Sequence, residues 1–334
     1  MRYFLIFMLV TLAPVAQGGG TLDRVKKKGL VRCGVTQGLP GFSSPDGKGN
    51  WTGIDVDVCR ALAAAILNDP AKVRFVPLSA KERLTALQSG EIDVLSRNTT
   101  WTLGRDGPLG LNFTAVVYYD GQGFMVRRSL GIKSARELDG ATVCVNIGTT
   151  TELNVADYFR SQKMKYRLVA YEKDDEVVAA YDAGRCDVYT TDQSGLYANR
   201  LKLKKPADHM ILPEVISKEP LAPAVRHGDD QWQDIVRWTV FALTSAEELG
   251  VNRANVQSMR KSGNPEVRRF LGTDGSLGKS LGLSNDWALR IIAGVGNYGE
   301  VFEKNLGRSS PLKIERGLNA LWKDGGLHYP MPFR

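Results

Sequence analysis

Residues 91–105 read EIDVLSRNTTWTLGR, and this stretch predicts one edge of an open α/β sheet. It begins as an apolar strand containing Ile92, Val94 and Leu95, then turns abruptly polar and ends at Arg105. A strand that ends in such a loop presents backbone amides and polar side chains at its carboxyl end. Ligands of open α/β sheets bind at that edge.

The side chains of this loop favour an anionic ligand. The guanidinium group of Arg105 is a planar fork that fits a carboxylate through two hydrogen bonds, which a lysine cannot do. We interpret the loop, with Thr100 and Arg105, as a site for the α-carboxylate of a free amino acid. The alternative is a surface turn in which Arg105 merely pairs with Asp106.

Length and composition set the broad class of protein. At 334 residues the chain exceeds a typical single domain, which predicts two domains. Its hydrophobic share of 43% and charged share of 24% are ordinary for a soluble globular protein. The net charge of +8 is spread along the chain without interleaved aromatic residues, so we expect a solvated cationic surface and no nucleic-acid partner.

The first 18 residues have the pattern of a secretory signal peptide. Arg2 precedes an apolar run over residues 3–15, and a small-x-small sequence follows at residues 16–18. The run is shorter than the roughly 20 residues that a membrane span needs, although an uncleaved anchor is the alternative. We expect residues 1–18 to be removed and the mature protein to lie outside the cytoplasm.

Four cysteines in an exported chain allow three pairings. Cys33 lies in a predicted strand and Cys59 in the helix that follows, whereas Cys144 and Cys186 share a later α/β region. We predict the disulfides Cys33–Cys59 and Cys144–Cys186, with four free buried thiols as the alternative. No closely spaced ligand pair is present and the three histidines are scattered, so we expect no metal and no cofactor.

The order of predicted elements indicates two α/β lobes joined by two crossovers. We expect lobe 1 to comprise residues 21–121 and 222–334, including a helical tail, and lobe 2 to comprise residues 122–221. In each lobe the strands end in loops rich in hydroxyl groups. These loops should face each other across a cleft.

Two loops of lobe 2 carry candidate ligand contacts. Gly148, Thr149 and Thr150 follow a strand and begin a helix, which predicts an anion site at the helix start. A simple helix cap is an equally common explanation of this pattern. Asp192 ends another strand and suits an ammonium group, unless it caps the helix that begins near Ser194.

Lobe 1 contributes three further candidates. Leu39 and Phe42 lie in a loop rich in Gly and Pro, where they either wall the pocket or pack structurally. We expect Arg83 to be exposed, either to solvent or to the cleft.

Taken together, these motifs resemble the bacterial extracellular solute-binding proteins of family 3, the periplasmic amino-acid-binding proteins of ABC importers. The markers of the resemblance are residues 53–58 (GIDVDV), residues 87–93 (LQSGEID), Arg105 twelve positions after Asp93, residues 148–150 (GTT) and residues 187–192 (DVYTTD). The long tail and residues 38–42 are most similar to the general L-amino-acid branch. The implied fold is a type II two-lobed periplasmic binding protein with two hinge strands and a helical C-terminal extension.

The resemblance also implies roles for the loop residues. Arg105 would bind the α-carboxylate, with help from Thr100, Thr149 and Thr150. The α-ammonium group would bind Asp192.

Three further assignments follow from the same resemblance. The backbone near Asn98 would assist in binding the ammonium group. Leu39 replaces an aromatic residue that often stacks on the ligand, which favours a roomier pocket. Arg83 would meet polar or acidic ligand side chains.

The implied function is capture of free L-amino acids by closure of the lobes, followed by delivery to an inner-membrane ABC permease. We expect a monomer without enzymatic activity. One alternative is a dehydratase-like enzyme on the same scaffold, for which no convincing acid–base pair is present. Another is a sensory or adhesive binding module. A third is a dinucleotide enzyme, because residues 294–299 fit G-x-G-x-x-G, but no βαβ unit surrounds them.

Overall fold

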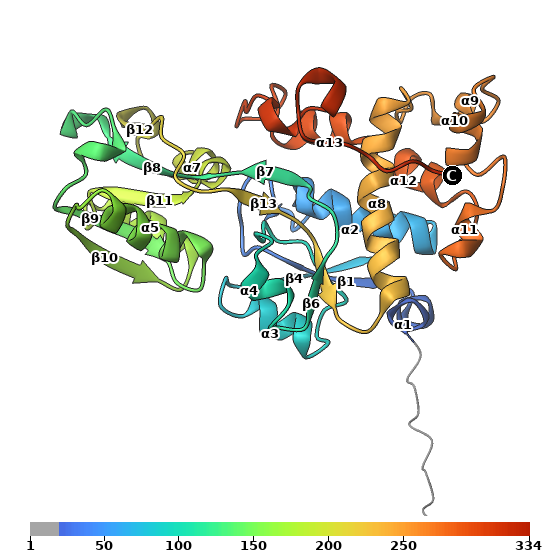
Figure 1. The fold of residues 1–334 in the computed structure, drawn as a ribbon, viewed down its shortest axis with the longest axis horizontal. Coiled ribbons are helices and arrows are strands. Elements are labelled where there is room, and N and C mark those ends of the chain that lie inside the picture. The colour runs from blue at the N-terminus through green and yellow to red at the C-terminus, as the bar shows by residue number, and fades with distance from the viewer. Residues whose placement is uncertain (1–19) are drawn as a thin grey trace, which may run out of the picture.

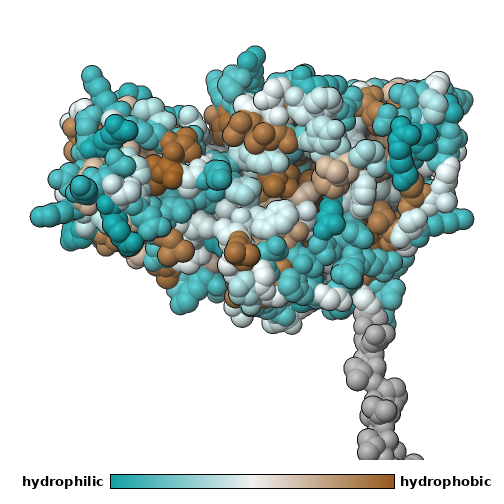
Figure 2. Space-filling view, in the orientation of Figure 1, coloured by the Kyte–Doolittle hydropathy of each residue, from teal (hydrophilic) through white to brown (hydrophobic). Residues whose placement is uncertain are grey.

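The computed structural model describes residues 20–334, which form two lobes with a narrow connection (Figure 1). The predicted signal peptide lies outside the described residues. From residue 20 onward, no helix combines the length and apolarity that crossing a membrane requires. The face seen in Figure 2 is mostly hydrophilic, with apolar residues in small separate groups.

Lobe 1 is built on a five-stranded sheet of order β4-β1-β5-β14-β6. Strand β1 pairs in parallel with β4 and β5, and β14 runs antiparallel to β5 and β6. The strands of this lobe are β1 (Val31–Val35), β4 (Val73–Pro77), β5 (Val94–Leu95), β6 (Leu111–Phe113), β14 (Ala224–Arg226) and the small pair β2 (Ser44–Pro45) and β3 (Trp51–Thr52). The helices are α1 (Thr21–Lys28), α2 (Ile54–Leu67), α3 (Arg83–Gln88), α4 (Leu103–Asp106) and α8 (Asp230–Glu248).

Helix α2 is the centre of the lobe 1 core. Its run of alanine, valine and leucine favours a helix and leaves little side-chain bulk, so neighbours approach closely on nearly every side. It packs against β1, against helix α8 and against helix α12 (Trp287–Val295) of the C-terminal tail. Gly53, just before α2, has φ +131°, and a Cβ there would lie 2.0 Å from the carbonyl oxygen of Phe42, so this position requires glycine.

Lobe 2 contains the second sheet, of order β10-β9-β11-β8-β12. Strands β10, β9 and β11 are parallel, whereas β8 is antiparallel to both of its neighbours. Its strands are β8 (Gln122–Arg127), β9 (Ala141–Asn146), β10 (Tyr166–Tyr171), β11 (Val188–Asp192) and β12 (His209–Ile211). Its α-helices are α5 (Thr150–Ser161), α6 (Asp174–Asp182) and α7 (Gln193–Arg200), with short 3₁₀ turns at η1 (Arg128–Leu130), η2 (Ala135–Glu137) and η3 (Pro206–Asp208).

Two antiparallel strands, β7 (Tyr118–Asp120) and β13 (Glu219–Leu221), connect the lobes, as the sequence predicts (Figure 1). Asp120 lies directly opposite Glu219 in this pair. The hinge therefore carries two acidic residues side by side.

Both predicted disulfides are present. Cys33–Cys59 joins β1 to α2, and Cys144–Cys186 joins β9 to the segment just before β11. Each lobe thus has one bridge between neighbouring elements of its own α/β layer. By the chain-entropy argument such a bridge stabilises by about 3 kcal/mol.

The tail packs on lobe 1 and adds α9 (Val256–Met259), α10 (Pro265–Phe270), α11 (Leu277–Ser280), α12 (Trp287–Val295), α13 (Tyr298–Asn305), η4 (Gly317–Asn319) and η5 (Trp322–Asp324). It also holds hinge strand β7. The Asn319 side chain accepts from the Tyr119 amide at 2.7 Å and donates to its carbonyl oxygen at 3.0 Å. The tail therefore fixes the lobe 1 end of the hinge.

The glycines of residues 294–299 have structural roles in this tail. Gly294 lies in α12, where a Cβ would come within 3.4 Å of Ala64 on α2. Gly296 ends α12 with φ +92°, and Gly299 lies within α13. Because the motif joins two helices and follows no strand, the dinucleotide interpretation is wrong.

Candidate functional site

A cavity lies between the lobes where the polar loops of both sheets converge. It is lined by Ala80, Arg83, Arg97, Asn98 and Thr100 of lobe 1 and by Asn146, Thr149, Thr150, Thr151, Asp174, Thr191 and Asp192 of lobe 2. The lobes meet at this point, since the hydroxyl oxygens of Thr100 and Thr150 are 3.4 Å apart. Six of the residues singled out in the sequence thus share one cavity: Arg83, Asn98, Thr100, Thr149, Thr150 and Asp192.

Arg105 lies immediately behind the cavity wall, in the short helix α4. Its guanidinium group is almost buried, with 8% of the residue exposed, and Nη1 donates to the carbonyl oxygen of Thr100 at 2.9 Å. Burial lowers the Arg105 pKa, and the nearby charges of Glu219 and Asp192 oppose that shift. The alternative partner, Asp106, instead accepts from the backbone amide of Phe113.

Asp192 brings a buried negative charge to the cavity from the end of β11. It occupies the N-cap position of α7, but its side chain makes no capping hydrogen bond, so that structural alternative is not realised. Burial, together with the charges of Asp120 and Glu219, raises the Asp192 pKa well above its usual range. A ligand cation placed here would relieve that repulsion.

Some polar groups at the start of α5 cap the helix, and others are free to face the cavity. The Thr149 hydroxyl accepts from the Glu152 amide at 3.1 Å and donates to the Asn146 carbonyl oxygen, which makes it a true helix cap. The Gly148 amide donates to the Glu152 side chain, and Gly148 is not part of the cavity lining. The amides of Thr150 and Thr151, at the start of α5, have no acceptor within the helix, so these two amides are the groups that can meet an anion.

Asn98 is held in an uncommon backbone conformation with φ +32°. Its amide donates to Asp55 Oδ2 at 2.9 Å, and the Ser96 hydroxyl donates to Asp55 Oδ1. Burial raises the pKa of Asp55 to about 6, although both hydrogen bonds favour its charged form. Asp55, within the GIDVDV marker, therefore fixes the loop that carries Asn98.

The structure favours one of the alternatives left open for each of three lobe 1 residues. Arg83 is not exposed to solvent: only 3% of the residue is accessible, and it lines the cavity. Leu39 and Phe42 belong to the lobe 1 core, where Phe42 packs edge-on against Tyr118 with ring centroids 5.5 Å apart. Neither Leu39 nor Phe42 lines the cavity, in agreement with the structural alternative.

Several residues in or beside the cavity were not predicted from the sequence. Asn146 ends β9, and Asp174 follows the end of β10 by three positions, so the reasoning from strand ends that was used for Asp192 would have found both residues. Arg97 lies inside the opening stretch but was not singled out. Glu219 and Asp120 lie beside the cavity lining and had no local signal, because only the pairing of the two crossover strands brings them there.

Three buried polar atoms of the cavity lining lack a hydrogen-bond partner: Arg83 Nε, Asn98 Oδ1 and Asn146 Nδ2. A buried polar group left unpaired is unfavourable, and a polar ligand would satisfy all three atoms. The cavity thus combines cationic and anionic groups with unsatisfied donors and an acceptor. Within residues 20–334, no group of three or more His, Cys, Asp or Glu side chains is placed to hold a metal ion.

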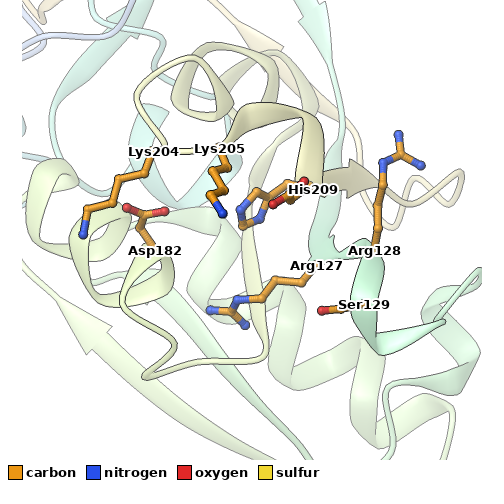
Figure 3. Close-up of a pocket in the computed structure, with 8 residues that line it drawn as sticks. Arg127, Arg128, Ser129, Asp182, Lys204, Lys205 and His209 are labelled. Carbon is orange, nitrogen blue, oxygen red and sulfur yellow. The ribbon is translucent and has the colours of Figure 1, made fainter.

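A wider hollow of about 530 Å³ lies away from the cleft, on lobe 2 (Figure 3). It is lined by Arg127, Arg128, Ser129, Asp182, Lys204, Lys205, Asp208 and His209. Figure 3 shows the Arg127 and Arg128 side chains extending in different directions, and both already donate to backbone carbonyl oxygens. None of the described residues around this hollow has a buried unpartnered atom, so the cleft is the better ligand site.

The sequence also matches known proteins. Residues 31–252 match the family described as bacterial extracellular solute-binding proteins, family 3. The general L-amino acid-binding periplasmic protein AapJ of Rhizobium johnstonii is 63% identical over 96% of this chain and 94% of its own length. The glutamate/glutamine/aspartate/asparagine-binding protein BztA of Rhodobacter capsulatus is 55% identical over 98% and 97% of the two chains.

Among solved structures, a periplasmic binding protein of an ABC transporter from Brucella ovis, with glutathione bound, has a TM-score of 0.93. It is 60% identical in sequence and covers 95% of this chain and all of its own. The family match spans most of the described fold, including both hinge strands and every residue of the cavity lining. The chain therefore belongs to the bacterial extracellular solute-binding proteins, family 3.

Proposed function

We propose that this protein is the periplasmic binding component of an amino-acid ABC transporter. It captures a free L-amino acid between its lobes and delivers it to an inner-membrane permease. The observation that supports this proposal is a buried cavity between the lobes that Asp192 of lobe 2 lines, with Arg105 of lobe 1 directly behind the lining residue Thr100 and close enough to feel the charge of Asp192. The similarity to AapJ and BztA, both named as amino-acid-binding proteins, supports it.

The mechanism is closure of the lobes on a ligand that carries both charges. Arg105 binds the α-carboxylate from lobe 1, and Asp192 binds the α-ammonium from lobe 2. Because a zwitterion satisfies both groups only when the lobes approach, it binds the closed form better and shifts the population toward it. The closed form is then the one that the permease receives.

The rest of the cavity favours ligands whose side chains accept hydrogen bonds. Arg83 Nε and Asn146 Nδ2 are both buried donors without a partner. An acidic or amide side chain would satisfy them, whereas an aliphatic one would leave them unpaired. BztA, with glutamate, glutamine, aspartate and asparagine in its name, supports the same preference.

A thermal-shift panel over the twenty L-amino acids tests the proposed function, since a ligand that binds only the folded state raises Tm. Glutathione belongs in the panel because its γ-glutamyl end carries a free α-carboxylate and α-ammonium. We expect the largest shifts with glutamate, glutamine, aspartate and asparagine. A panel without any shift would refute the proposal, and normal amino-acid uptake in a deletion strain would favour the sensory alternative.

Arg83→Met is expected to change selectivity. The substitution keeps a long side chain but removes the charge and the donors, so the Kd for glutamate should rise by about tenfold or more. The Kd for alanine should rise by less than about threefold, because alanine has no group to pair with Arg83. Calorimetric titration of both ligands measures the ratio. Equal losses for both ligands would show that Arg83 does not read the side chain.

Binding is also expected to weaken as the pH falls. Burial raises the pKa of Asp120 to about 6, and the Asp192 pKa is raised well above its usual range. The ligand ammonium favours charged Asp192 and lowers its pKa, so binding releases protons and the Kd rises toward acid pH. Calorimetry with glutamine between pH 8 and 5.5, in buffers of different ionisation enthalpy, measures the protons released. A pH-independent Kd without proton release would contradict this linkage.

A further inference from the structure

Glu219 stands out among the charged groups that the proposed mechanism leaves unused. It lies on hinge strand β13, opposite Asp120, and is 1% exposed. Its carboxylate accepts four hydrogen bonds, from Thr100 Oγ1 (2.6 Å), Thr150 Oγ1 (2.8 Å), Asn154 Nδ2 (2.7 Å) and Ser217 Oγ (2.6 Å).

These four donors come from three parts of the molecule. Thr100 belongs to lobe 1, Thr150 and Asn154 belong to α5 in lobe 2, and Ser217 belongs to the segment leading into β13. The hydroxyls of Thr100 and Thr150 converge on the same oxygen, Oε2, from opposite sides of the cleft. One carboxylate on the hinge therefore joins both cavity walls, and it can do so only while the lobes are together.

The direction of these bonds determines what the threonines offer to a ligand. A hydroxyl group has one proton to donate and two lone pairs to accept with. The hydroxyl groups of Thr100 and Thr150 both donate their hydrogen bond to Glu219, so each can only accept a hydrogen bond from a molecule in the cavity. An acceptor suits an ammonium group and repels a carboxylate.

We propose that Glu219 is a positioning residue for the ammonium end of the ligand. Its carboxylate accepts hydrogen bonds from the hydroxyl groups of Thr100 and Thr150, so the lone pairs of these hydroxyls face the ligand ammonium group. This inference rests on the proposed function. It moves the two hydroxyls from the carboxylate, where the family resemblance suggested them, to the ammonium; Arg105 and the backbone amides remain for the carboxylate.

Glu219→Gln tests the inference with almost no change of shape. Asn154 Nδ2 donates to Oε1, so the glutamine oxygen stays there and its NH₂ group replaces Oε2. Thr100 and Thr150 must then accept from that NH₂ group and direct their protons into the cavity. The Kd for the best amino acid of the panel should rise by about tenfold or more, as for loss of a hydrogen bond to a charged group.

The matched control is Glu214→Gln, the same change in the segment that precedes β13. Glu214 accepts from Ser134, and both residues lie in lobe 2 away from the cavity. The Kd of Glu214→Gln for the same amino acid should stay within about twofold of the wild-type value. Thermal unfolding of each variant without ligand verifies that it folds. If Glu219→Gln does not fold, Glu219→Asp serves in its place, because the shorter carboxylate cannot reach both threonines.

Two readouts separate positioning from a general structural role. The first is the preference for the amino acid over its 2-hydroxy analogue, which should shrink at least about fivefold in Glu219→Gln because only the ammonium depends on the acceptors. The second is a double-mutant cycle with Thr100→Val and Thr150→Val combined. In that background Glu219→Gln should change the Kd by less than about threefold.

Each outcome decides a different question. Any of three results would overturn this inference alone. The Kd of Glu219→Gln could equal that of the wild type, or its preference for the amino acid over the hydroxy analogue could be unchanged. Finally, Glu219→Gln could weaken binding by the full amount even when Thr100 and Thr150 are both replaced by valine. The last of these results would mean that Glu219 meets the ligand directly. A wild-type protein that binds no amino acid would overturn the proposed function and this inference together.

Discussion

Arg105→Ala is expected to raise the Kd for every L-amino acid by about a hundredfold, because truncating one partner of a buried charge pair costs about 3 kcal/mol. Arg105 is 8% exposed and sits behind Thr100 at the cavity. Without its guanidinium group, the ligand carboxylate would be buried with no cation to pair with it. Isothermal titration calorimetry measures the loss directly.

Two further variants sharpen the Arg105 experiment. Arg105→Lys keeps the charge but loses the planar fork, so its Kd should lie between those of the wild type and Arg105→Ala. Arg128→Ala, in the outer hollow of lobe 2, removes an arginine away from the cleft and should leave the Kd unchanged. An Arg105→Ala protein with wild-type affinity would remove Arg105 from the site.

Asp192→Asn is expected to have two effects of opposite sign. The Kd should rise by at least about a hundredfold, since the ammonium loses its buried partner. The protein without ligand should become more stable at pH 7.5, with Tm raised by about 2–4 °C for each kcal/mol gained. The reason is that charged Asp192 is buried beside Asp120 and Glu219, and an amide removes that repulsion.

The gain in stability expected for Asp192→Asn depends on pH. The pKa of Asp192 is higher in the folded protein than in the unfolded chain, so its ionisation destabilises the fold above that raised pKa. The gain from Asp192→Asn should therefore be largest at alkaline pH and disappear below about pH 4, where the carboxyl is protonated in both states.

Differential scanning calorimetry across that pH range measures the effect on stability. Asp157→Asn, an exposed carboxylate on α5, is the control and should not shift Tm measurably. A lower Tm for Asp192→Asn at pH 7.5 would mean that charged Asp192 stabilises the unliganded fold, against this account.

The sequence predicted those parts of the site that depend on local order. Residues 91–105, residues 148–150 and Asp192 each mark a strand that ends in a polar loop, and the structure brings residues of all three to one cavity. The disulfides were predictable for the same reason, since each joins neighbouring elements of one α/β layer. Strand order and loop chemistry are properties of short stretches of chain.

Features that depend on tertiary packing were not predictable in this way. Leu39 turns into the core because its amide and carbonyl pair with Ser43 and close the loop on itself. Arg83 shares its cavity with Asp174 and Asp192 of lobe 2, which lie more than 90 positions away in the sequence. Glu219 reaches Thr100 across 119 positions of sequence, and only the pairing of β7 with β13 brings them together.

The most direct measurement is a calorimetric comparison of three ligands: the preferred L-amino acid, its 2-oxo acid, which lacks the ammonium, and its α-amide, which lacks the α-carboxylate. If Arg105 and Asp192 hold the two charged ends of one molecule, only the amino acid binds tightly, and each analogue binds at least about a hundredfold more weakly. If either analogue binds as tightly as the amino acid, the protein does not hold its ligand by both charged ends.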